Sequence, residues 1–152
     1  MSATLRNFRY YSLIICLTGF MMTISTSCKK DSVEPELTGA EQVMQLLVGG
    51  AWSLQSLQVD GTDQTALFSG LSLFFSGTGF TASGGEPVWP ASGTWSFDDD
   101  SGNSITRADG ITVAINSINN TSLQLTLTWG KNTLGSGRTG SVSGVHVFLF
   151  GR

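Results

Sequence analysis

The stretch Leu123-Gln124-Leu125-Thr126-Leu127-Thr128-Trp129 alternates apolar and polar side chains without a break. Successive side chains of a β-strand point to opposite faces of a sheet, so this period of two places every apolar residue on one face. The opposite face then carries only hydroxyl and amide groups. The stretch predicts a half-buried strand, and it indicates an all-β domain in which one face of the sheet covers a core.

Similar apolar patterns recur on both sides of this strand and are separated by turn signals. We expect further strands within residues 52–59, 71–75, 80–82, 89–97, 104–106, 111–115 and 145–150. The first of these changes phase at Gln55 and Ser56, which predicts a bulge or bend. Asp60-Gly61 and Asp109-Gly110 predict tight turns, and residues 98–103 predict a hairpin connection. The last strand is apolar on both faces, so it is a central strand or pairs back onto the first.

One short helix is expected before the strands. Thr38-Gly39-Ala40-Glu41 matches a capping box, and apolar residues follow at helical spacing as far as Gly49-Gly50, which predicts a helix over residues 39–48. Strands that follow one another this closely favour antiparallel neighbours. We therefore expect residues 38–152 to form an antiparallel up-and-down barrel of about eight strands, which leaves no sheet edge exposed. A β-sandwich is the alternative.

The N-terminus has the organisation of an export signal. Arg6 and Arg9 precede an apolar stretch at residues 13–24, which is shorter than the roughly 20 residues of a membrane-spanning helix. Small residues then lead into Cys28. We expect residues 1–27 to be a lipoprotein signal peptide and Cys28 to receive the lipid. An ordinary secretory signal with a stray cysteine and an uncleaved anchor are the alternatives.

The run Ser27-Cys28-Lys29-Lys30-Asp31 resembles the start of mature lipoproteins in certain Gram-negative bacteria. This resemblance implies export and attachment to the cell envelope through the lipid, at the outer membrane. Residues 28–37 are charged and aperiodic, which predicts a flexible tether between the lipid and the domain. Ser32 lies in a short pattern that resembles an O-glycosylation site of such bacteria.

Composition argues against several classes of partner and site. Six of the eight Lys and Arg residues and all eleven Asp and Glu residues follow residue 27, which gives the mature chain a formal charge of −5. We expect no nucleic-acid partner, because phosphate backbones require a basic surface. The two cysteines, Cys16 and Cys28, both precede residue 38, so the predicted domain has neither a disulfide nor a thiolate metal site.

Three local patterns suggest chemistry but have simpler explanations. Residues 135–140 match G-x-G-x-x-G, yet a strand rather than a helix follows them, so we expect a flexible hairpin loop and no nucleotide site. Asp98-Asp99-Asp100 could offer oxygens to calcium, but a calcium loop also needs a bidentate acidic residue further along the chain, and none lies at the expected distance. We therefore expect these residues to form a solvated hairpin tip. His146 is the only histidine and lies among apolar residues, which favours packing. We expect no metal and no cofactor.

Three further segments resemble the lipocalin-like domains of small bacterial lipoproteins. They are Gly50-Ala51-Trp52 after a short helix, Gly93-Thr94-Trp95-Ser96-Phe97 before an acidic turn, and residues 121–125 at the start of the long alternating strand. The resemblance covers about residues 40–150 and implies an eight-stranded barrel without enzymatic activity. Such domains also place a basic residue near the last strand, packed over the first tryptophan. This chain departs from that pattern, because Arg138 lies far from the last strand and Arg152 comes only after it.

A barrel of this size can hold one small ligand or fill its interior with side chains. We consider a binding module for a small apolar molecule or a glycan first, and a structural or accessory subunit of an envelope complex second. An enzyme is the least favoured, because the domain has no second histidine and no evident acid pair. The candidate ligand-binding residues are Trp89, Trp95, Trp129 and Phe148. Trp89, which precedes Pro90, is expected to be exposed at the barrel mouth.

Overall fold

The structure, a computed structural model, describes residues 37–131 and 142–152. One α-helix, α2 (Gly39–Leu47), precedes the strands, and a short 3-10 helix, η1 (Thr65–Phe68), lies between two of them. The strands are β1 (Ala51–Val59), β2 (Thr62–Asp63), β3 (Ser72–Phe75), β4 (Gly79–Ser83), β5 (Ser92–Phe97), β6 (Ser104–Arg107), β7 (Thr112–Ile118), β8 (Ser122–Trp129) and β9 (Gly144–Gly151). Among these residues, no helix has both the length and the apolar character that a membrane span requires.

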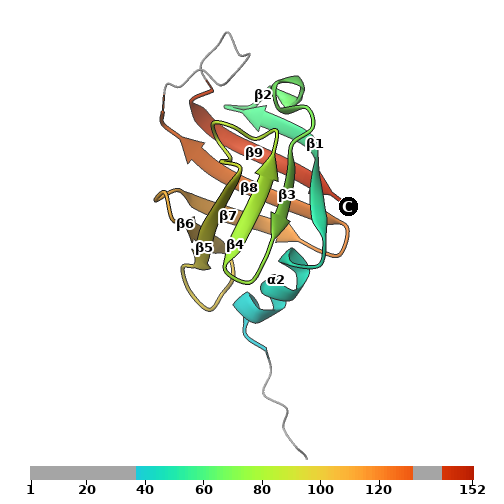
Figure 1. Cartoon of the computed structure of the whole chain (residues 1–152), viewed down its shortest axis with the longest axis vertical. Coiled ribbons are helices and arrows are strands. Elements are labelled where there is room, and N and C mark those ends of the chain that lie inside the picture. Colours follow the sequence, from blue (N-terminus) through green and yellow to red (C-terminus); the bar gives the residue numbers. More distant parts are fainter. Residues whose placement is uncertain (1–36, 132–141) are drawn as a thin grey trace, which may run out of the picture. The chain divides into compact units, whose positions relative to one another are not determined.

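Eight of the strands form a closed antiparallel barrel (Figure 1). From β3 to β9 each strand pairs with the next one along the chain, and β1 pairs with both β3 and β9. The two-residue strand β2 pairs only with the end of β1. The pairing of β1 with β9 closes the sheet on itself, so the predicted up-and-down barrel is confirmed and the sandwich alternative is wrong.

The first strand contains the predicted bulge. Leu54 lies opposite Phe150, whereas Ser56 lies opposite Leu149, so Gln55 is an extra residue in β1. An extra residue changes which side chains face inward, which explains the change of phase in the sequence. The bulge lets Trp52 and Leu57, an odd number of positions apart, both lie in the core with no exposed surface.

The barrel interior is lined by the inward-facing residues of every strand. In β8, Leu123, Leu125 and Leu127 are at most 2% exposed, as the alternation of that segment predicts. The final strand β9 lies between β8 and β1, and the outward-facing Val145 and Leu149 of its apolar sequence are 42% and 39% exposed. Its inward face is fully buried at Phe148 and Phe150.

Helix α2 covers one end of the barrel. Its predicted capping box is present, because Thr38 and Glu41 each bond the other's backbone N–H. At the other end of the helix, Leu47 is fully buried and its carbonyl accepts a hydrogen bond of 3.0 Å from Nε1 of Trp52. The predicted helix over residues 39–48 is therefore confirmed, with Val48 as its C-cap.

Arg152 joins three separate parts of this helical end. Its guanidinium lies 4.0 Å from the centre of the Trp52 ring. Its Nη2 donates to the Leu46 carbonyl at 2.8 Å, and its Nε donates to the Asn120 carbonyl at 2.7 Å. One side chain therefore connects the C-terminus of α2, the β7–β8 turn and the start of β1.

The opposite end, which we call the loop end, is formed by η1, the segment of residues 84–91 between β4 and β5, and the turn of residues 108–111 between β6 and β7. The β1–β2 connection also lies here, and Asp60 and Gly61 adopt the left-handed conformations that suit a tight hairpin turn. Phe68 from η1 is fully buried. The loop end is therefore covered by folded segments of the chain itself.

Candidate functional site at the loop end

Trp89 enters the barrel from the segment of residues 84–91. Its side chain has no exposed surface, so the prediction of an exposed aromatic at the barrel mouth is wrong. The segment turns inward because the Trp89 N–H bonds the Gly85 carbonyl at 2.8 Å. A Cβ at Gly85 would lie 2.5 Å from that of Trp89, so only glycine allows this close approach.

The ring of Trp89 lies among other aromatic rings rather than in an open space. Its centroid is 5.5 Å from that of Phe80, 6.2 Å from that of Phe148 and 6.5 Å from that of Phe75, in edge-to-face arrangements. Such arrangements are favourable between aromatic side chains. This part of the interior is therefore filled by side chains.

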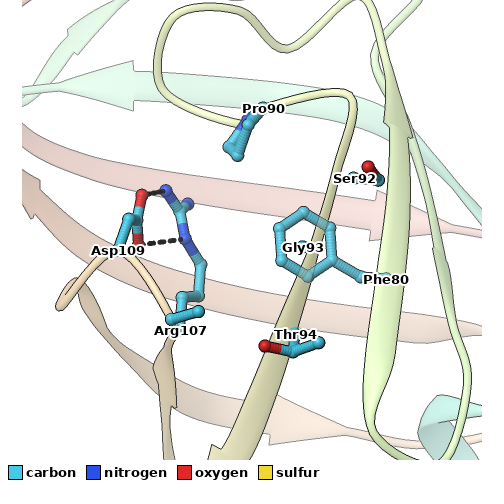
Figure 2. Close-up of a pocket in the computed structure, with 8 residues that line it drawn as sticks. Phe80, Pro90, Ser92, Gly93, Thr94, Arg107 and Asp109 are labelled. Atoms are coloured by element: carbon cyan, nitrogen blue, oxygen red, sulfur yellow. Dashed lines mark hydrogen bonds and ion pairs between the residues drawn. The ribbon is translucent and has the colours of Figure 1, made fainter.

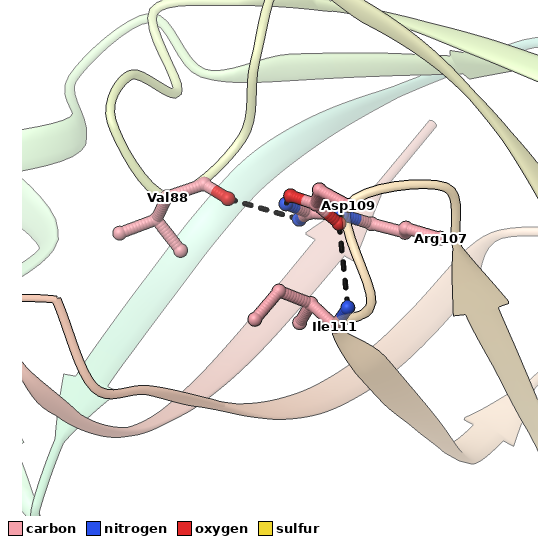
Figure 3. Close-up of polar contacts among 4 residues, drawn as sticks. All are labelled: Val88, Arg107, Asp109 and Ile111. Carbon is pink, nitrogen blue, oxygen red and sulfur yellow. Dashed lines mark hydrogen bonds and ion pairs between the residues drawn. The ribbon is translucent and has the colours of Figure 1, made fainter.

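Arg107 is the buried charge of the loop end, and sequence analysis missed it. It is the last residue of β6 and lies two positions after the buried Ile105, so it also faces inward and is only 2% exposed. Its Nη1 donates to the Val88 carbonyl at 2.9 Å (Figure 3). Its Nε and Nη2 donate to the two carboxylate oxygens of Asp109. A bidentate pair of this kind holds both side chains in one orientation.

The guanidinium of Arg107 also lies over two aromatic rings. It is 4.8 Å from the centre of the Trp89 ring and 5.8 Å from that of the Phe80 ring. Cation–π attraction of this kind gains strength when water is excluded. Arg107 thus connects the segment of residues 84–91, through Trp89 and the Val88 carbonyl, to the β6–β7 turn.

Asp109 remains ionised at neutral pH. Partial burial opposes its ionisation, but the hydrogen bonds and positive charge of Arg107 outweigh that effect and hold the pKa of Asp109 below its ordinary value. The backbone N–H of Ile111 makes a further hydrogen bond to the same carboxylate. The Asp109 side chain is one-third exposed, so its oxygens border both the buried guanidinium and the surface.

A pocket of about 280 Å³ opens beside this ion pair. Figure 2 shows Arg107 and Asp109 on one side, Phe80 over Gly93 on the other, and Pro90 and Thr94 above and below. Its remaining lining residues are Ser92 and Ala108. A Cβ at Gly93 would lie 2.7 Å from the Phe80 ring, so glycine at this position allows the ring to lie flat against β5.

Several buried hydrogen-bond donors of the barrel have no partner among the described residues. Arg107 has five N–H groups, of which three have partners within the part of the chain that the structure describes. The buried Nε1 atoms of Trp89 and Trp129 also have no hydrogen-bond partner among the described residues. Buried donors are normally satisfied by protein, water or ligand. Of these groups, only Arg107 lines the pocket.

The four candidate ligand-binding residues are all at most 5% exposed. The structure brings Trp89 and Phe148 into contact, and Phe75 connects Trp89 to Trp95 at centroid distances of 6.5 and 5.9 Å. Trp129 contacts Lys131, whose Nζ lies 5.2 Å from the ring centre. None of these four residues lines the pocket of Figure 2, which instead has Arg107, Asp109, Phe80 and Pro90 on its walls.

The other local patterns have structural roles where they are described. His146 is fully buried between Phe68 and Phe148, as expected of a packed histidine. In the hairpin of residues 98–103, Asp98 accepts hydrogen bonds from Ser104 and Thr106, and these bonds lower its pKa. Within residues 37–131 and 142–152, no three His, Cys, Asp or Glu side chains are grouped as metal ligands. Residues 135–140, the predicted flexible loop, lie outside the described residues.

Comparison with known proteins gives no relative. No family model matches the chain, and neither a curated protein nor a solved structure matches it.

Proposed function

We propose that this protein is a lipid-anchored lipoprotein of a bacterial envelope whose barrel binds a small molecule at the loop end. The pocket beside Arg107 and Asp109 carries the binding part of the proposal. Small-molecule sites typically combine apolar walls with a few fixed polar groups, and this pocket does so. The sequence around Cys28 supports the anchoring part.

The packing of Arg152 supports a lipocalin-like domain. The sequence resemblance implies a basic residue near the last strand that packs over the first tryptophan. Arg152 directly follows β9, and its guanidinium lies over Trp52 at 4.0 Å. The eight-stranded meander with a preceding helix agrees with the same resemblance.

Anchoring through Cys28 can be tested by labelling. We expect the full chain, expressed in a Gram-negative host with labelled palmitate, to incorporate label and to fractionate with membranes. Cys28→Ser should abolish both, because it removes the only thiol that follows the predicted signal sequence. Cys16→Ser is the matched control and should leave both unchanged. Labelling that persists in Cys28→Ser would contradict the proposal.

Binding at the pocket can be tested by native mass spectrometry. We expect the lipoprotein, purified from its own envelope, to retain a non-covalent small molecule. Ala108→Trp should remove that molecule, because Ala108 is exposed at the pocket wall and the indole would fill the space. Ala51→Trp is the control, since Ala51 is also exposed but lies on β1 near the helical end.

A second function follows from the filled interior. Phe75, Phe80, Phe148 and Trp89 occupy the space in which barrels that bind larger ligands hold them. This packing favours a structural or accessory subunit of an envelope complex. Absence of any retained small molecule from the wild-type lipoprotein would contradict the binding proposal and favour this alternative.

A further inference from the structure

The charges at the pocket are already balanced. The positive charge of Arg107 is matched by Asp109 in a bidentate pair, and among the described residues no other charged side chain lines the pocket, although Lys131 lies near enough to act on Asp109. An anionic ligand would approach the Asp109 carboxylate, and a cationic ligand would compete with Arg107 for it. An ion without its own counter-charge is unfavourable where water is excluded. The pocket therefore favours a neutral ligand.

The unused donors favour a ligand with oxygen acceptors. Arg107, which lines the pocket, has two N–H groups without a partner among the described residues, and the Asp109 carboxylate beside it is one-third exposed. A purely apolar ligand would remove water from the Asp109 carboxylate without replacing its hydrogen bonds, which is unfavourable. Hydroxyl groups can accept from N–H donors and can also donate to the Asp109 carboxylate, so a hydroxylated ligand satisfies both.

The walls of the pocket favour a ligand that is apolar on one face. The rings of Phe80 and Pro90 and the methyl group of Ala108 form apolar surfaces, while Ser92 and Thr94 add hydroxyl groups at the rim. The volume of about 280 Å³ is just below the usual range for drug-sized ligands, so it suits a single ring. A pyranose ring has an apolar C–H face and hydroxyl groups around its edge.

We propose, resting on the proposed function above, that the pocket between Arg107–Asp109 and Phe80 binds one neutral sugar ring of a glycan. The apolar face of the sugar lies against Phe80 and Pro90. Its hydroxyl groups accept from the free N–H groups of Arg107 and donate to Asp109. This assignment chooses the glycan over the small apolar molecule as the ligand class.

The proposal can be tested by saturation-transfer NMR on the acylated lipoprotein in detergent micelles. The probes are the methyl glycosides of glucose, galactose, mannose and N-acetylglucosamine, and the comparison probes are cyclohexylmethanol, benzoate and benzylamine. We expect at least one glycoside to bind and to be lost in Ala108→Trp. We expect Thr94→Val to weaken binding several-fold, whereas Thr128→Val, an exposed change on β8, should not.

The outcomes separate this proposal from the one on which it rests. Binding of only the apolar or ionic probes, with loss in Ala108→Trp, would overturn the sugar assignment and support the binding module. Failure of every glycoside to bind would also overturn the sugar assignment. The binding module itself is then judged by the molecule that native mass spectrometry finds on the wild-type lipoprotein. A retained molecule that contains no sugar would support the proposal of a binding module and would overturn the sugar assignment.

Discussion

Replacing Trp52 with alanine is expected to lower the free energy of unfolding of the barrel by about 3–5 kcal/mol. Trp52 has no exposed surface, and its Nε1 donates to the Leu47 carbonyl. The substitution would leave a cavity between α2 and the barrel and would remove the ring beneath the Arg152 guanidinium. Domains of this size have only about 5–15 kcal/mol of stability, so the loss is a large fraction of the total.

Chemical denaturation followed by circular dichroism measures this effect. Trp52→Phe is a milder variant, because it keeps an aromatic ring and loses the hydrogen bond, so it should stay folded and lose less. Phe74→Ala is the matched control: Phe74 is 46% exposed on β3, and its loss should change stability little. Equal losses in Trp52→Ala and Phe74→Ala would contradict the packing role of Trp52.

The barrel itself could be predicted because its pattern is local. In β8 the alternation of Leu123, Leu125 and Leu127 with polar residues is sufficient to identify a strand with one buried face. The bulge at Gln55 was also visible, since an extra residue shifts the phase of the apolar positions. Closure was expected because it removes exposed sheet edges, and the pairing of β1 with β9 confirms it.

Trp89 shows where local reasoning failed. The glycine- and proline-rich sequence around it correctly indicates a loop, and loops usually lie at the surface. This segment instead folds inward, because aromatic neighbours from β3, β4 and β9 together provide a buried environment for the indole. Those neighbours come from distant parts of the chain, so the sequence near Trp89 contains no sign of them.

The burial of Arg107 could have been predicted from the sequence. It lies two positions after Ile105, in the inward phase of β6, and Asp109 follows two residues later. A charged residue in the buried phase of a strand, with an opposite charge nearby, suggests a paired buried ion. The contact of Arg152 with Trp52 could not be located in this way, because it depends on where β9 ends relative to β1.

Replacing Arg107 with alanine is expected to lower the free energy of unfolding by about 3 kcal/mol, the lower end of the range for breaking a buried ion pair. Asp109 is one-third exposed, so the charge left behind is partly hydrated, which is why we choose that end of the range. The Val88 carbonyl would also lose its donor, and Trp89 and Phe80 would lose the cation above them.

A double-mutant cycle in urea, with Arg107→Met and Asp109→Asn as its two single changes, separates these contributions. Asp109→Asn leaves the Arg107 guanidinium, which is 2% exposed, without its carboxylate, so it should also be destabilising. In the double variant Arg107→Met, Asp109→Asn no unpaired charge remains, and the methionine can still pack against Trp89. We expect this variant to be more stable than the sum of the two single changes predicts. Simple additivity would contradict an energetic coupling between the two residues.

The pH dependence of stability gives an independent test of the same pair. Because Arg107 holds the pKa of Asp109 below its ordinary value, ionised Asp109 stabilises the folded state. That contribution is fully present above the unfolded-state pKa, about pH 4, and is lost as the pH falls through the lower pKa of the folded state.

The measurement compares wild type with Asp109→Asn over a range of pH. Other carboxylates with lowered pKa values, such as Asp98 and Asp63, titrate in both of these proteins. The difference in stability between wild type and Asp109→Asn should therefore be constant near neutral pH and should shrink only in acid. A difference that stays constant throughout the acid range would show that the carboxylate charge of Asp109 contributes nothing to holding Arg107 in place.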